Sequence, residues 1–63
     1  MGYKIVVHYS DGSTAEENDF LSEKDVEESM RTYIRVMEKY QNWNVKVIKV
    51  ELLEGDKIVK IIS

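Results

Sequence analysis

The dipeptide Asp11-Gly12 constrains the fold of this sequence more than any other feature. It follows residues 3–9, YKIVVHY, in which β-branched and aromatic residues alternate as in a half-buried strand. A two-residue turn with positive φ at both positions is a strong hairpin signal. We therefore expect a hairpin that sets Val7 opposite Glu16, with a short polar returning strand over residues 13–18.

A second hairpin is predicted around Gly55-Asp56, between strands at residues 43–53 and 57–62. A two-residue loop at this point makes the charged cross-strand pairs complementary and brings the apolar residues together. The pairs expected in this register are Glu54–Lys57, Leu53–Ile58, Leu52–Val59 and Glu51–Lys60.

Helix signals fill the segment between the hairpins, and we expect a helix over residues 23–40. Ser22 is the predicted N-cap with Asp25 three residues later, and Leu21 and Val26 have the spacing of a hydrophobic staple. Apolar residues recur at helical spacing and form one stripe toward the core. These residues are Val26, Met30, Tyr33, Ile34, Met37 and Tyr40.

The order strand–strand–helix–strand–strand predicts a single α+β domain over residues 1–63, with one helix packed on one face of a four-stranded mixed sheet. The last strand, at residues 57–62, is apolar on both faces and is expected in the centre. The second strand is acidic and the third carries lysines, so both suit edges. With strands numbered in chain order, this predicts the order 2-1-4-3, with strands 1 and 4 parallel.

In hairpin–helix–hairpin order and in length, the chain resembles the small β-grasp domains, such as the immunoglobulin-binding domains of protein L. The resemblance implies an architecture, and no binding residue is carried over from it. The compact style, with YKIVVHYSDGS leading into an acidic helix start, also resembles small uncharacterised proteins of phages and mobile elements.

His8, Ser10 and Asp11 are the residue types of a hydrolase triad. Residues i and i+2 of a strand share a face but lie about 6.6 Å apart along it. A nucleophile and its base must approach within roughly 2.6–3.2 Å. Asp11 lies in the turn, where its side chain bonds local backbone. We therefore interpret this stretch as a turn and expect no enzymatic activity.

No metal or cofactor site is expected from the sequence. The chain has one histidine and no cysteine, and its three glycines are isolated. Glu16, Glu17 and Asp19 could hold calcium or magnesium weakly, but they lack the spacing of a calcium-binding loop.

The net charge of −3 is unevenly distributed, because seven carboxylates and a single lysine fall within residues 16–28. This acidic block argues against direct nucleic-acid binding, which requires a cationic footprint. An acidic decoy that imitates nucleic-acid phosphate is one alternative function. The residues expected on this acidic surface are Glu16, Glu17, Asp19, Glu23, Glu27 and Glu28.

The second face of the sheet is the most informative feature for function. In the expected register the helix covers Ile48, Val50, Leu52, Val59 and Ile61. One helix cannot cover both faces, so apolar residues on the other face should form a contact surface. A bulge near Val47-Ile48 would instead turn the first part of this strand inward. The expected contact residues are Trp43, Val45, Val47, Leu53, Ile58 and Ile62.

Together these features predict a non-enzymatic protein-binding module, an inhibitor or adaptor; the resemblance to phage proteins implies one that is encoded by a phage and acts on a host or defence protein. A homo-oligomer holding a small ligand at its interface and an engineered scaffold are further alternatives. So small a core favours a homodimer. No signal peptide or membrane span is recognisable, so we expect a cytoplasmic protein without membrane contact.

Overall fold

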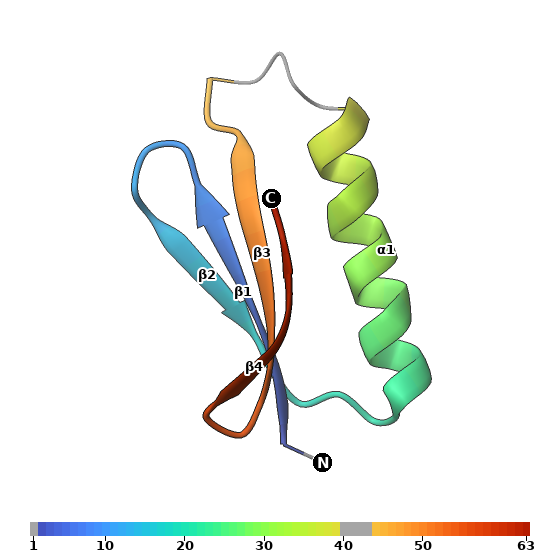
Figure 1. Cartoon of the computed structure of the whole chain (residues 1–63). Coiled ribbons are helices and arrows are strands. Elements are labelled where there is room, and N and C mark those ends of the chain that lie inside the picture. Colours follow the sequence, from blue (N-terminus) through green and yellow to red (C-terminus); the bar gives the residue numbers. More distant parts are fainter. Residues whose placement is uncertain (1, 40–43) are drawn as a thin grey trace.

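Within the described residues, the backbone forms four strands and one helix in the predicted order (Figure 1). The computed structural model describes residues 2–39 and 44–63. The predicted helix start is confirmed, while residue 40 of the apolar stripe lies outside the described residues. The elements are β1 (Tyr3–Tyr9), β2 (Thr14–Glu17), α1 (Glu23–Lys39), β3 (Val47–Glu54) and β4 (Lys57–Ile62).

The sheet order is β2-β1-β3-β4, and every pairing is antiparallel. The α+β class is confirmed, but the predicted order 2-1-4-3 and the parallel pairing of β1 with β4 are wrong. The apolar composition of β4 suggested a central position, yet the fully buried residues Ile5, Val7 and Val50 all belong to β1 and β3. Every β4 residue except Ile62 is exposed.

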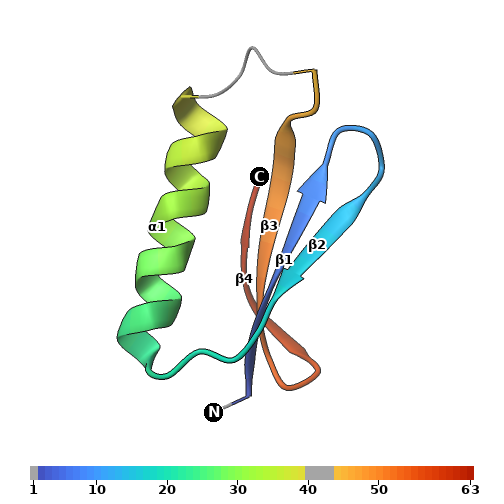
Figure 2. The same cartoon turned by 180° about the vertical axis from the view of Figure 1, so that it is seen from behind.

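The core lies between α1 and one face of the sheet. Figures 1 and 2 show α1 on one side of the strands alone, running alongside the sheet. The predicted alternation of β1 and the predicted helix stripe both meet here, because Ile5 and Val7 pack with Val26 and Met30. Half-buried residues around this core are Tyr3, Tyr9, Phe20, Tyr33, Met37, Val47, Leu52 and Ile62.

Ser22 caps α1 as predicted, since its Oγ accepts a hydrogen bond from the Asp25 N–H at 3.3 Å. The predicted hydrophobic staple is wrong, because Leu21 is 91% exposed while Val26 is buried. Phe20 packs against the core instead. The turn before it holds Asp19 at φ 64°, a left-handed conformation that aspartate tolerates better than most residues.

The first hairpin has a three-residue loop, Ser10 to Gly12, in place of the predicted two-residue loop. The Gly12 N–H donates to the Tyr9 carbonyl at 3.1 Å, and only Gly12 takes a positive φ, at 89°. This is the pattern of a type I turn followed by a glycine bulge. The register therefore shifts by one residue: Val7 faces Ala15, and the predicted Val7–Glu16 pair is wrong.

The second hairpin has the predicted two-residue loop, with Gly55 at φ 62°. A bulge then interrupts the register between Leu52 and Leu53, so that Val59 has no partner on β3. Beyond it every pair is shifted by one residue, and two of the predicted pairs are wrong. The pairs Glu54–Lys57 and Leu53–Ile58 are confirmed, whereas Leu52 faces Lys60 and Glu51 faces Ile61.

A second bulge lies at the start of β3. The register passes from the His8–Lys49 pair to the Tyr9–Val47 pair, which leaves Ile48 unpaired. A one-residue slip exchanges the two faces of a strand. Val47 consequently packs against the core, as the bulge alternative predicted, while Ile48 is 52% exposed and is not covered by the helix.

Gly12→Val is expected to destabilise the fold by more than about 1 kcal/mol, because a β-branched residue is strained at positive φ. No atom lies within 4 Å of a Cβ built at Gly12, so the loss reflects backbone conformation and not a clash. Urea unfolding measures it. Gly12→Asn is the control, since asparagine accepts this conformation; equal stability of the valine variant and wild type would contradict the turn.

Ser22→Ala is expected to lower the free energy of unfolding by about 1 kcal/mol, through loss of the bond to the Asp25 N–H. Thermal or urea unfolding provides the measurement. Ser22→Asp restores an acceptor at the cap and should recover most of the loss. If the aspartate variant is as unstable as the alanine variant, the cap does not explain the helix start.

Candidate functional site

The sheet face opposite α1, here called the open face, is defined by the strand register. Ile5 and Val7 point into the core, so their neighbours on β1 point the other way. Residues directly opposite one another on adjacent strands share a face. The open face therefore comprises Lys4, Val6, His8, Thr14, Glu16, Lys49, Glu51, Leu53, Ile58 and Ile61.

Polar side-chain pairs occupy the middle of the open face. His8 Nε2 contacts Glu51 Oε1, and both side chains are largely covered, with 27% and 14% exposed. Lys4 Nζ lies 3.7 Å from Glu16 Oε1. Sequence reasoning missed the His8–Glu51 pair, because it arises only when β1 and β3 are adjacent and antiparallel.

The triad-like residues His8, Ser10 and Asp11 are each engaged elsewhere. The Asp11 carboxylate accepts bonds from the hydroxyl and the N–H of Ser13, which lower the Asp11 pKa. Ser10 Oγ accepts the Lys46 N–H at 2.9 Å. Asp11 thus closes the turn through local bonds, as predicted, while the bond from Lys46 to Ser10, which was not predicted, ties the turn to the segment before β3.

Exposed apolar side chains gather on β4, at one edge of the sheet. Ile58 is 48% exposed, Val59 46% and Ile61 53%. Leu53 is half-buried beside Ile58, its cross-strand partner. Here these four residues, Leu53, Ile58, Val59 and Ile61, are called the β4 patch.

The predicted contact residues divide between the two faces of the sheet. Leu53 and Ile58 lie on the open face as expected. Val47 and Ile62 were expected there but pack against the core, Ile62 through its pairing with Val50. Val45 precedes β3 and is 40% exposed, and Trp43 lies outside the described residues.

The bulge on β4 also changes the position of two residues that were expected under the helix, and Ile61 exchanges faces. Ile61 faces Glu51 on the open face, and Val59 is the extra residue of the bulge. Both are about half exposed. Val50 and Leu52 do lie on the helix side, as predicted.

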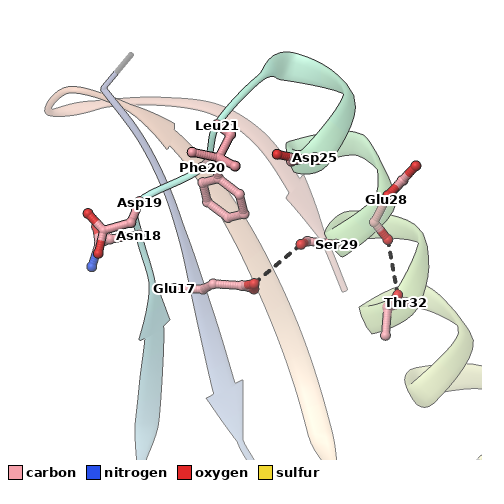
Figure 3. Close-up of a pocket in the computed structure, with 9 residues that line it drawn as sticks. All are labelled: Glu17, Asn18, Asp19, Phe20, Leu21, Asp25, Glu28, Ser29 and Thr32. Carbon is pink, nitrogen blue, oxygen red and sulfur yellow. Dashed lines mark hydrogen bonds between the residues drawn. The ribbon is translucent and has the colours of Figure 1, made fainter.

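The acidic residues do not form one surface. An open depression of about 440 Å³ lies between α1 and the β2–α1 loop, and Glu17, Asp19 and Glu28 are among the residues that line it (Figure 3). Glu16 lies on the open face. Glu23 and Glu27 line a separate hollow beside Tyr3 and Leu52.

Glu17 joins β2 to α1 and is half-buried. Its carboxylate accepts a bond from Ser29 Oγ at 3.3 Å, visible in Figure 3, and one from the Tyr33 hydroxyl at 2.9 Å. Burial raises the pKa of Tyr33 to about 12, and the bond to Glu17 adds to the shift. Sequence analysis placed Glu17 on the solvated acidic surface, whereas the structure gives it a role in joining two elements.

Within residues 2–39 and 44–63, no group of three or more histidine, cysteine, aspartate or glutamate side chains is arranged to hold a metal ion. In the same part of the chain, no helix combines the length and the hydropathy needed to cross a bilayer.

Comparison of the chain with protein-family models, curated proteins and solved structures finds no match. The function is therefore argued from the geometry of these surfaces.

The Tyr33–Glu17 bond predicts how stability depends on alkaline pH. Burial and the bond to Glu17 raise the pKa of Tyr33 from 10.0 to about 12. The contribution of the protonated Tyr33 to the free energy of unfolding is therefore complete below pH 10 and is lost as the pH rises toward 12. Ultraviolet titration of tyrosinate should show one tyrosine ionising near pH 12.

Tyr33→Phe should remove this late ionisation, and Glu17→Gln should move it to lower pH. Tyr3→Phe is the control and should leave the step near pH 12 in place. A wild-type titration with every tyrosine ionising near pH 10 would contradict the burial of the Tyr33 hydroxyl.

Proposed function

We propose that this chain is a non-enzymatic protein-binding module, an inhibitor or adaptor, whose contact surface is the β4 patch. The observation that carries the proposal is the half exposure of three large apolar side chains on one edge strand. Fully burying an isoleucine is worth about 1.5–3 kcal/mol. Because Ile58 and Ile61 are each about half exposed, about half of this burial free energy remains available at each of them when a partner binds.

The proposed surface is narrower than the one expected from sequence. The middle of the open face carries the His8–Glu51 and Lys4–Glu16 pairs, which favour contact with water or polar groups. The apolar contact is therefore restricted to the β4 end. A polar area beside a small apolar centre is the usual composition of a protein interface.

The acidic decoy is the alternative that the geometry favours less. Its residues line two different hollows and, in the case of Glu16, the open face. Glu17 is already bonded to Ser29 and Tyr33, and Glu16 lies beside Lys4. A decoy requires carboxylates arranged along one face, as phosphates are along a nucleic acid.

Affinity capture from a lysate of the source organism tests the proposal. Immobilised wild type should retain a partner that Ile58→Lys loses, because the substitution places a charge within the apolar contact. Retention should persist at high salt, whereas binding through a decoy surface would weaken steeply.

Arg35→Glu is the matched control, since it changes an exposed charge on α1 and should not affect capture. Circular dichroism should show Ile58→Lys folded and Val50→Lys, at a fully buried site, unfolded. Equal capture by wild type and Ile58→Lys would refute the proposed surface. Sedimentation equilibrium of both proteins shows whether a second copy of the chain is the occupant.

A further inference from the structure

The geometry points to β4 as an edge that binds an extended segment of a partner protein, with apolar and acidic residues in alternation, as a fifth strand of the sheet. This inference rests on the proposed function and specifies its partner. Strand addition of this kind gains affinity from main-chain hydrogen bonds and specificity from alternate side chains.

The direction of the β4 amides follows from bonds at the ends of β1. The Tyr9 N–H donates to Ser13 across the first hairpin, and the Ser10 N–H donates to Lys46 on the side of β3. The Gly2 carbonyl also lies on the β3 side, where it accepts the Gly55 N–H at 2.7 Å. Because amide direction alternates along a strand, the even-numbered residues of β1 face β3.

Lys4 and Val6 therefore direct their amides toward β3, where their partners are Leu53 and Glu51. These two β3 residues point their own amides back at β1 and away from β4. The β4 residues opposite them, Ile58 and Ile61, form the non-hydrogen-bonded pairs of the β3–β4 ladder. Consequently the N–H and C=O groups of Ile58 and Ile61 point outward, away from β3.

The apolar side chains of the same two residues lie on the open face, where Ile58 is 48% exposed and Ile61 is 53% exposed. A strand lying beside β4 would thus meet main-chain groups and apolar side chains at the same positions. Residues of that strand with amides toward β4 would place their side chains on the open face. They should be apolar, to contact Ile58 and Ile61.

Charge determines the other side chains of the partner. β4 contains Lys57 and Lys60 and no acidic residue. Both lysines lie on the helix side, opposite Glu54 and Leu52. Lys60 also lines a groove of about 400 Å³, whose other charged residues are Arg31 and Glu27, so the cations outnumber the single carboxylate. The intervening residues of an added strand would project to this side and should be acidic.

A second copy of β4 fits this edge poorly. Antiparallel pairing of β4 with itself would gather four lysines on one face, and like charges on adjacent strands are destabilising. Lysines and a bulge, as at Val59, are the means by which edge strands resist indiscriminate pairing. The β4 edge is therefore expected to bind an acidic partner strand in preference to a second copy of β4.

Blocked seven-residue peptides of alternating glutamate and valine provide the probe, followed by amide NMR of the whole chain. The Glu–Val peptide should shift and protect the amides of Ile58 and Ile61. A Lys–Val peptide of the same length should bind at least about tenfold more weakly. Lys60→Glu should reverse this preference, while Arg35→Glu should not.

N-methylation of the peptide separates backbone pairing from simple apolar contact. Methylation at the valines should abolish binding, because their amides face β4, whereas methylation at the glutamates should leave it unchanged. Equal binding of both methylated peptides, or no shift at Ile58 and Ile61 at millimolar peptide, would overturn the inference. If the peptides fail while capture still depends on Ile58, strand addition is wrong and the proposed contact surface stands.

Discussion

The antiparallel pairing of β1 with β3 is the constraint on which the rest of this structure depends. It sets Val7 beside Val50 and Ile5 beside Leu52, directly beneath the two buried residues of α1. The bond from Gly55 to Gly2 and that from Ser10 to Lys46 hold its two ends. Once these strands are central, β2 and β4 are necessarily the edges.

Local sequence signals were enough to predict where the helix and strands lie. They were not enough to predict the strand order, which depends on contacts between distant parts of the chain. The alternation of β1, the Ser22 cap and the Gly55 turn each act over a few residues, and each was predicted correctly. The Gly12 turn was predicted at the right place but with a loop one residue too short. Strand order depends on which apolar residues the helix can cover. The apolar character of β4 suggested burial on both faces, but α1 covers the seam of β1 and β3, so the prediction failed there.

The residues of the candidate site could be predicted only where the predicted strand register was correct. Leu53 and Ile58 precede the β4 bulge along the hairpin and were placed correctly, whereas Ile61 and Ile62 follow it and exchanged faces. Neither bulge residue, Val59 or Ile48, has a distinctive sequence signal. The partners of His8 and Glu17 were missed for a related reason, since both contacts join segments that lie far apart in the chain.

Size explains why an apolar edge is left uncovered. Among residues 2–39 and 44–63 the buried core contains five residues, two of them from α1, and a chain of this length rarely gains more than about 3–5 kcal/mol from its core. A helix of 17 residues that already covers β1 and β3 cannot also reach the open face. Burying Ile58 and Ile61 requires a second layer or a further strand, and within the described residues neither exists. The free energy of burying these two side chains would therefore contribute to binding a partner, as proposed above. A fifth strand would both cover the side chains and supply hydrogen bonds to the outward main-chain groups of the same two residues.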